Sequence, residues 1–331
     1  MVVEVTRGEL VESVHAVFAC ASDARGNALF ASGDVDAPVF LRSSAKPFIA
    51  AAVVAAGARE RFGLDDREIA VMAASHSGQL FHVNAVRSIL RKIEMPESAL
   101  FCGPHLPYNE KAAQAMLRRG ETPTAVENNC SGKHAGILAL CRILDADPST
   151  YLDAQNPAQR EILAFCARLS DEDPQRWPLA VDGCGIPVYA TSLRRAALAF
   201  ARFATLDCLA ERDARALAVV RDAMIARPEY VAGTGEFDSE LMRVAGGDLA
   251  SKGGAEGVHG VAAIGRGFGY ASKVVDGAAR ARAPSSIAAL RSLGALDDER
   301  VERLARFARP VVYNRAGRAV GEIRCLITST V

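Results

Sequence analysis

The chain has 331 residues, of which 50% are hydrophobic, and its 39 Lys and Arg residues balance its 39 Asp and Glu residues. This length supports a substantial core, and the absence of net charge argues against a nucleic-acid partner or an anionic membrane surface. No apolar run approaches the ~20 residues of a membrane span, and the charged segment from Met1 to Leu10 lacks the apolar region of a signal peptide. We therefore expect a globular, cytoplasmic protein.

The first part of the chain predicts short strands and then a buried helix. Strands are predicted at 11–20, 28–32 and 39–41, the first two flanking a Gly/Asn turn. Pro47 suits a first helical position, and the helix predicted from Phe48 to Ala56 is apolar on all sides. Such a helix should be central and buried, which places Lys46 at its mouth.

The middle of the chain predicts mostly helices. They are expected at 66–74, 81–93, 109–119, 135–144, 157–169, 192–204, 210–226 and 235–245. Ser75-His76-Ser77-Gly78 follows the first of them as a turn, and residues 178–190 predict a strand broken by a Gly-Cys-Gly turn.

Strands return beyond residue 248. They are predicted at 258–264 and 268–274, followed by helices at 285–293 and 298–308 and a C-terminal hairpin of 310–313 and 319–328. Hairpins rather than βαβ repeats predict an α/β (α+β) fold with an antiparallel sheet built from both chain ends. We expect one domain, 1–331, in which 1–45 and 248–331 form the sheet and 46–247 is mainly helical.

Lysine is scarce, because only 6 of the 39 basic residues are Lys. Three of these lysines lie in compact motifs: Lys46 in Ser43-Ser44-Ala45-Lys46, Lys133 in Asn128-Asn129-Cys130-Ser131-Gly132-Lys133-His134, and Lys252 in Ser251-Lys252-Gly253-Gly254. Arg cannot lose its proton in a protein, whereas a desolvated Lys can. These lysines therefore suggest chemistry that needs a neutral amine, either a base for serine or a metal ligand.

Ser43 and Lys46 would share one face of a helical turn, where the helix N-terminus lowers the pKa of the amine. This layout resembles the Ser-x-x-Lys acyl enzymes, such as penicillin-binding proteins and β-lactamases. Lys252-Gly253-Gly254, before a late strand, is a loose echo of their Lys-Thr-Gly. The alternative is a helix-capping Ser beside a surface Lys.

The 8 cysteines are spread along the chain, and we expect them to be reduced and mostly buried. Cys130 and Cys184 differ, because each lies among glycines and polar residues. With Lys133 or His134 they could form a small thiolate metal site on loops. The alternative is two loop thiols that are close by chance. The turn at Ser75 is likewise either a site or only a helix terminus.

Taken in order, these segments resemble one family, the rhizobial-type L-asparaginases, also called class 3 or the asparaginase II family. The matching stretches are Val11-Glu12-Ser13-Val14-His15, Arg42-Ser43-Ser44-Ala45-Lys46-Pro47-Phe48, Ser75-His76-Ser77-Gly78, Cys102-Gly103-Pro104-His105, Asn128 through Gly136, Asp182-Gly183-Cys184-Gly185-Ile186-Pro187-Val188-Tyr189 and Ser251-Lys252-Gly253-Gly254. The chain departs mildly from the sequence pattern of this family at Val14-His15-Ala16 and at Ile49. Neither departure touches a proposed catalytic residue.

The resemblance implies a fold like that of serine β-lactamases and a homodimer that hydrolyses L-asparagine to L-aspartate and ammonia. It implies two Ser–Lys pairs, a zinc ion held by two Cys and a Lys, and further residues near the site. In this sequence the pairs are Ser43 with Lys46 and Ser75 with Lys252, the zinc ligands are Cys130, Lys133 and Cys184, and the further residues are Arg42, His134 and Asp182.

On this reading, Ser43 attacks the side-chain amide carbon of asparagine while neutral Lys46 takes its proton. Two lysines in one pocket disfavour double protonation, so activity should rise on the alkaline side of neutrality. Arg42 would bind the α-carboxylate and Asp182 the α-ammonium group, unless the two pair with each other. Zinc would support substrate affinity rather than activate water.

Three other functions remain open at this stage. One is a penicillin-recognising hydrolase with the same Ser-x-x-Lys layout, although no export signal is visible. A second is a glutaminase or broader amidase on the same scaffold. A third is a non-catalytic zinc-binding regulator, which would bind metal and release no ammonia.

Overall fold

The computed structural model describes residues 1–327 and divides into two compact units. The sheet unit comprises Met1–Ser44, Thr191–Thr205 and the chain from Glu240 onward, and the helical unit comprises Ala45–Ala190 and Leu206–Ser239. The expectation of one domain over residues 1–331 stays a prediction. The predicted end of the last strand, Thr328, lies outside the described residues.

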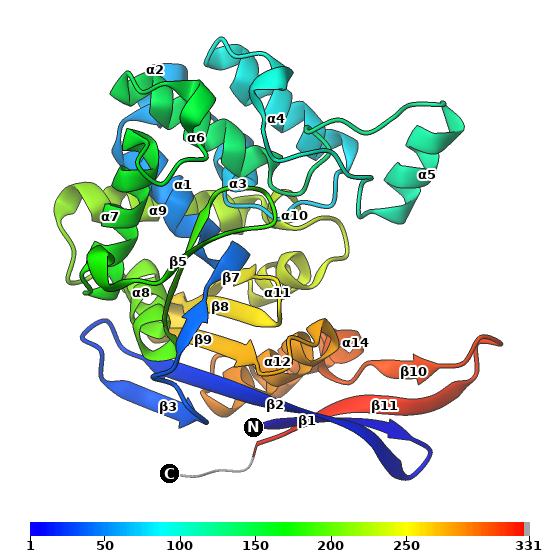
Figure 1. The fold of residues 1–331 in the computed structure, drawn as a ribbon. Helices are drawn as coiled ribbons and strands as arrows, with labels where there is room; N and C mark the ends of the chain where they lie inside the picture. The colour runs from blue at the N-terminus through cyan, green and yellow to red at the C-terminus, as the bar shows by residue number, and fades with distance from the viewer. Residues whose placement is uncertain (328–331) are drawn as a thin grey trace. The chain divides into compact units, whose positions relative to one another are not determined.

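The sheet unit contains eight strands in one sheet, in the order β10-β11-β1-β2-β9-β8-β7, with β3 paired to β2 (Figure 1). Their bounds are β1 Val2–Arg7, β2 Leu10–Ser22, β3 Ala28–Ser32, β7 Leu249–Gly253, β8 Val258–Ala263, β9 Phe268–Val274, β10 Val311–Tyr313 and β11 Ala319–Leu326. The neighbouring strands pair antiparallel. The expected antiparallel sheet built from both chain ends is therefore confirmed.

The long strand β2 joins the two halves of the sheet. Its first half pairs with β1, with Val3 opposite His15. Its second half pairs with both β3 and β9, with Cys20 between Ala31 and Ala271. We did not expect β1 from the sequence, because its charges obscured the period-two burial of Val3 and Val5.

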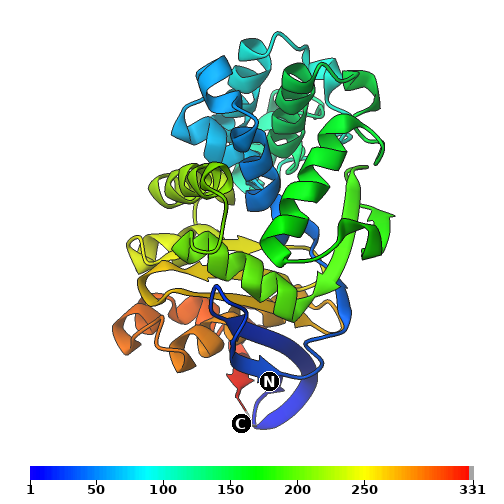
Figure 2. The same cartoon turned by 90° about the vertical axis from the view of Figure 1, so that its left-hand side faces the viewer.

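Helices cover both faces of this sheet (Figure 2). The helices and short 3-10 turns of this unit are η1 Arg42–Ala45, α8 Leu193–Thr205, α11 Phe237–Ala245, η5 Ile264–Arg266, η6 Ala279–Ala281, α12 Arg282–Ser292, α13 Asp298–Arg303 and α14 Ala305–Ala308. Glycine lets α8 approach closely, because a Cβ at Gly269 would lie 2.1 Å from Ala197 O. On the opposite face, His259 Nδ1 lies 2.7 Å from Ser286 Oγ of α12.

The helical unit is built around α1, which packs against α6, α7 and α9. Its helices and strands are α1 Lys46–Ala55, α2 Ala58–Phe62, α3 Asp66–Met72, α4 Leu80–Lys92, η2 Glu97–Ala99, α5 Glu110–Arg118, α6 Ser131–Leu144, η3 Pro148–Thr150, α7 Pro157–Ser170, η4 Pro174–Arg176, β5 Leu179–Val181, β6 Pro187–Ser192, α9 Glu211–Ala226 and α10 Pro228–Val231. Within residues 1–327, no helix is long and apolar enough to cross a membrane.

Helix α1 behaves as its composition predicts. It begins at Lys46 with Pro47 in its first turn, and every residue from Lys46 to Val54 is buried. Because all sides of this helix are apolar, it is surrounded by other helices and brings the Lys46 side chain into the interior. The prediction that Lys46 lies at the mouth of a buried helix is confirmed.

Two motifs lie on different elements than we expected. The motif around Lys133 was expected on a loop, but α6 begins at Ser131, so Lys133 and His134 lie in its first turn. Lys252 was expected to precede a strand, yet it lies within β7. In both cases the glycines suggested a loop, whereas they allow close packing of a regular element.

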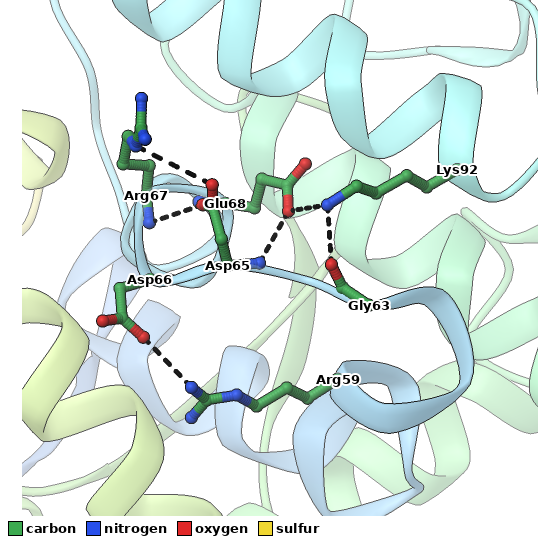
Figure 3. A network of polar contacts seen from close by, with 7 residues as sticks. All are labelled: Arg59, Gly63, Asp65, Asp66, Arg67, Glu68 and Lys92. Atoms are coloured by element: carbon green, nitrogen blue, oxygen red, sulfur yellow. Dashed lines mark hydrogen bonds and ion pairs between the residues drawn. The ribbon is translucent and has the colours of Figure 1, made fainter.

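A buried carboxylate fixes the connection between α2, α3 and α4 (Figure 3). The Glu68 carboxylate is almost fully buried and accepts hydrogen bonds from Lys92 Nζ at 2.6 Å and Asp65 N at 2.7 Å. Asp65 caps α3 in return by accepting from Glu68 N. In this capping box the Lys92 ammonium group pairs with the buried Glu68 carboxylate. The box holds the start of α3, the helix that leads to Ser75.

We expect Lys92→Met to lower the free energy of unfolding by about 1–3 kcal/mol, because it leaves the buried Glu68 carboxylate without its cation. Arg87→Met on the same helix is the matched control. Its partner is Glu97, and both side chains are exposed, so the change should stay within about 0.5 kcal/mol. Urea denaturation at neutral pH measures both, and equal losses would contradict the assigned role of the buried pair.

Candidate active site

Lys46 is the centre of a polar cluster inside the helical unit. Its side chain is 1% exposed. Nζ lies 2.6 Å from Ala74 O, 3.0 Å from Ser75 Oγ and 3.3 Å from Cys130 Sγ. Burial lowers the pKa of this amine, against the opposing influence of the Cys130 sulfur, and the charge of Lys133 lowers it further.

The three neighbours of Lys46 suit either protonation state. An ammonium group donates one hydrogen to each of them. A neutral amine can donate to Ala74 O and the Cys130 sulfur while its lone pair accepts the hydroxyl proton of Ser75. The arrangement therefore lets Lys46 exchange a proton with a serine without leaving another polar group unpaired.

The turn from Ser75 to Gly78 is tied to three other segments of the helical unit. Ser75 N donates to Val231 O, His76 N donates to Asn129 O, and Asn109 N donates to Ser77 O. Because Ser75 N is already bonded, it is not an available oxyanion donor in this conformation. Ser44 N is likewise bonded, to Leu41 O.

Glycine sets the position of α6 relative to α3. A Cβ at Gly132 would lie 2.1 Å from Val71 O, a separation that atoms cannot adopt, so the two backbones touch directly. The end of α3 leads to Ala74 and Ser75, and the start of α6 carries Lys133. The packing of the two helices thereby brings the serine turn beside Cys130.

Cys130, Lys133 and Cys184 form a thiol–amine cluster. Lys133 Nζ donates to Cys184 Sγ at 2.9 Å, and all three side chains are buried. A hydrogen bond from the Cys184 thiol lowers the pKa of Cys130 well below its ordinary value, and Lys133 and Lys46 add to this effect. The pKa of Cys184 is raised by the same hydrogen bond and by burial.

The same cluster keeps Lys133 charged. Burial opposes its positive charge, but Cys130 and Cys184 outweigh burial and raise the pKa of Lys133. Zinc takes sulfur and nitrogen donors, of which a neutral lysine amine is an uncommon one, and its catalytic sites have three protein ligands and an open fourth position. In residues 1–327 no group of three or more His, Cys, Asp or Glu side chains forms a metal site, so an ion here would need Lys133.

Cys184 is presented by the turn between β5 and β6. Asp182 N donates to Ile186 O and Gly185 N donates to Asp182 O, with Gly185 in the left-handed region at φ 91°. The Asp182 carboxylate accepts from Gly183 N at 2.9 Å and lies 4.0 Å from Cys184 Sγ. The predicted strand–turn–strand around Cys184 is confirmed, and it brings Asp182 to the thiol cluster.

His134 carries an unsatisfied polar atom. The Tyr151 hydroxyl oxygen accepts a hydrogen bond from Phe101 N at 2.7 Å. We therefore assign the hydroxyl hydrogen to a second hydrogen bond, which Tyr151 donates to His134 Nδ1 at 2.7 Å. The other nitrogen, His134 Nε2, is then a donor. It is buried and has no hydrogen-bond partner within the described residues. A buried donor without a partner costs free energy, which a bound ligand or water would recover.

The sheet unit holds the other site residues expected from the sequence. Arg42 adopts φ 50°, an uncommon conformation for a residue with a side chain, immediately before the half-buried Ser43. A Cβ at Gly254 would lie 3.0 Å from Leu41 O and 3.2 Å from Ser44 N. The end of β7 therefore packs on the segment that carries Ser43. Lys252 is buried in β7, where its Nζ donates to Gly253 O at 2.6 Å.

The structure thus brings together six of the predicted site residues in the helical unit: Lys46, Ser75, Cys130, Lys133, Asp182 and Cys184. The Ser43–Lys46 and Ser75–Lys252 pairs each combine one residue from each unit, so both pairs stay predictions. The Lys46–Ser75 hydrogen bond was not expected.

Sequence reasoning also missed the polar residues that support these side chains. Asn128 accepts from Cys130 N and donates to Cys102 O and Gly103 O. His105 Nε2 accepts from Asn129 N at 2.9 Å. Both supports come from motifs noted in the sequence, but only the fold shows what each side chain binds.

Comparison with known proteins gives one strong match and several weak ones. A family model described as L-asparaginase II matches residues 3–325. No match was found among curated proteins. Among solved structures, the chain is similar to Mglu in its glutamate form, with 13% identity, a TM-score of 0.38, and coverage of 84% of this chain and 61% of that chain.

The chain is also similar to Mglu in its native form in the presence of 4.3 M NaCl, with 15% identity, a TM-score of 0.36, and coverage of 84% of this chain and 60% of that chain. It therefore spans about three fifths of the length of these two Mglu chains. At such TM-scores the likeness carries no argument about fold or function.

In metal-free protein at neutral pH we expect Cys184→Ala to reduce the amount of thiolate, because it removes the hydrogen bond that most lowers the pKa of Cys130. Cys184→Ser is the matched control, since its hydroxyl can still donate. Ultraviolet thiolate absorbance followed with pH measures the difference. Equal thiolate in the Ala and Ser variants would contradict the assignment.

Proposed function

The chain belongs to the L-asparaginase II family, whose model matches residues 3–325, and from this we propose that it hydrolyses L-asparagine to L-aspartate and ammonia. Family membership implies an amidohydrolase. The observation that supports a serine mechanism is the buried Lys46 amine, whose Nζ lies 3.0 Å from Ser75 Oγ. A lysine with a lowered pKa beside a hydroxyl is an arrangement that activates serine.

In the proposed reaction, Ser43 Oγ attacks the side-chain amide carbon and neutral Lys46 takes the hydroxyl proton. The tetrahedral intermediate collapses to a β-aspartyl ester as the C–N bond breaks and ammonia leaves with a proton. Water then hydrolyses the ester and regenerates the serine. Ser75 and Lys252 form the second pair and deliver the proton to the departing ammonia.

The environment of Lys46 supports its role as a base. Its pKa is lowered chiefly by burial, so a larger fraction of the amine is neutral on the alkaline side of neutrality than for an exposed lysine. The hydrogen bond to Ser75 gives the proton a path toward the second serine. The rate should accordingly rise as pH increases through the alkaline side.

Recognition of asparagine requires one charge of each sign. We assign Asp182 to the α-ammonium group and Arg42 to the α-carboxylate. His134 Nε2, a buried donor with no partner in residues 1–327, is assigned to an oxygen of the substrate. A ligand that cannot accept a hydrogen bond from this donor would leave it unpaired and would bind poorly. The unpaired donor therefore favours a polar substrate.

We assign zinc to Cys130, Lys133 and Cys184, whose sulfur and amine donors fit it. Bound there, the ion would supply positive charge beside Asp182 and hold the turn between β5 and β6. Lys133 must lose a proton to bind it, so zinc and protons compete at this residue. We further propose a serine β-lactamase-like fold and a homodimer, both implied by the family resemblance.

Ammonia release from L-asparagine and L-glutamine, measured for the wild type, Ser43→Ala and Ser75→Ala, tests the serine mechanism. Ser75→Ala should lower kcat by about 10²-fold or more, since proton transfer by a positioned group contributes this much. Ser43→Ala removes the attacking oxygen and should lower kcat at least as far. Ser43→Ala should also abolish the ester adduct detected by mass spectrometry.

The neighbouring Ser44→Ala is the control, because Ser44 Oγ donates to Leu41 O at 2.6 Å and has no assigned role in the reaction. This variant should retain activity and lose a little stability. Full activity in Ser43→Ala would show that another residue attacks the substrate. A faster release of ammonia from glutamine would make the chain a glutaminase.

Removal of zinc with a chelator should raise KM for asparagine and leave kcat measurable, because the proposed base, nucleophile and proton donors are not zinc ligands. Steady-state kinetics on chelated and zinc-restored protein measures this, with zinc content determined in parallel. Complete loss of turnover, restored by zinc, would instead make the metal the hydrolytic centre.

A further inference from the structure

His76 joins the serine turn to the start of α6. Its imidazole is 0% exposed. Gly78 N donates to His76 Nδ1 at 3.2 Å, and His76 Nε2 lies 2.8 Å from Ser131 Oγ. The ring therefore links its own turn, through Gly78, to the first residue of α6.

The hydrogen bonds assign one arrangement of protons. Because Nδ1 accepts from Gly78, Nε2 must carry the proton and donate to Ser131 Oγ. The Ser131 hydroxyl in turn donates to Val126 O at 2.8 Å. Each polar hydrogen in this series of hydrogen bonds has an acceptor, and each nitrogen of the His76 ring has one partner.

The link connects the immediate neighbours of two side chains that meet at Lys46. His76 follows Ser75, and Ser131 follows Cys130. Lys46 Nζ lies 3.0 Å from Ser75 Oγ and 3.3 Å from Cys130 Sγ. A second tie of the same two segments, from His76 N to Asn129 O, runs through the backbone.

We propose that His76 is a positioning residue, which through Ser131 holds Ser75 and Cys130 at the separation that lets the Lys46 amine contact both. This inference rests on the proposed function, since it assigns a purpose to the Lys46–Ser75 contact. His76 touches neither substrate nor the reacting atoms in this role.

A catalytic role for the imidazole itself does not fit its surroundings. Both ring nitrogens are engaged within the protein. Burial holds the pKa of His76 well below its ordinary value, with smaller contributions from His82 and Lys46. A neutral, fully bonded ring is suited to fixing a distance and not to carrying a proton.

Two substitutions at position 76 separate its two bonds. His76→Asn can keep the bond from Gly78 N but is too short to reach Ser131, whereas His76→Gln can reach Ser131 with its amide N–H. Ser131→Ala removes the acceptor with the loss of one hydroxyl group. For the asparaginase reaction of the zinc-loaded protein, we expect kcat to fall by about 10–100-fold in His76→Asn and in Ser131→Ala.

The remaining readouts separate positioning from stability. KM should stay within about twofold, His76→Gln should recover most of kcat, and the double variant His76→Asn/Ser131→Ala should be no worse than either single one. The matched control is His15→Asn. His15 is another buried histidine with a bond at each nitrogen, to Asp276 and from Arg280, and its loss should lower Tm without lowering kcat.

Ser75→Ala, measured in parallel, distinguishes the ways to fail. If Ser75→Ala is inactive while Ser131→Ala keeps the wild-type kcat, the positioning role of His76 is overturned and the proposed function stands. If Ser75→Ala is fully active, the assigned role of Ser75 is overturned and this inference with it. Additive losses of kcat in the double variant would also overturn it, because two residues acting through one bond cannot contribute independently.

Discussion

The polar centre of the helical unit depends on the hydrogen bonds of the buried Lys46 amine. An amine without water needs an acceptor for each hydrogen, and Ala74 O, Ser75 Oγ and Cys130 Sγ supply them from two different segments. The ends of α3 and the start of α6 are therefore organised around one nitrogen. Apolar packing along α1 delivers that nitrogen, and the backbone ties of the serine turn hold its acceptors in place.

Charge is balanced locally around this nitrogen. The neighbouring thiols differ, since the pKa of Cys130 is lowered and that of Cys184 is raised. The two lysines also differ, since the pKa of Lys46 is lowered and that of Lys133 is raised. The lowered pKa of Cys130 favours a thiolate and the raised pKa of Lys133 favours an ammonium ion, a pair whose charges cancel. Such a pair lets Lys46 become neutral without leaving an isolated charge in the interior.

Composition and local motifs were enough to find the buried lysines. Scarcity of Lys singled out Lys46, Lys133 and Lys252, and each is 1% exposed. The alternation of strands and helices predicted the antiparallel sheet, because hairpin turns and apolar periods are local signals.

The partners of these residues could not be predicted in the same way. The Lys46–Ser75 contact joins positions 29 residues apart in the chain, and no local period encodes it. His76 and Ser131 come into contact only when α3 and α6 pack against each other. The start of α6 was misjudged for a related reason, since Gly132 suggested a loop until its contact with Val71 O showed why a helix needs glycine there.

That glycine has a consequence for how this sequence can vary. A single methyl group at position 132 would act as a wedge between α3 and α6, because its carbon would lie 2.1 Å from Val71 O. The wedge would spread the serine turn from the thiols while every reactive group stayed chemically intact. A methyl group is the smallest side chain that could replace the hydrogen of Gly132, so no substitution at this position avoids the clash. The position is therefore restricted to glycine, although glycine itself performs no chemistry.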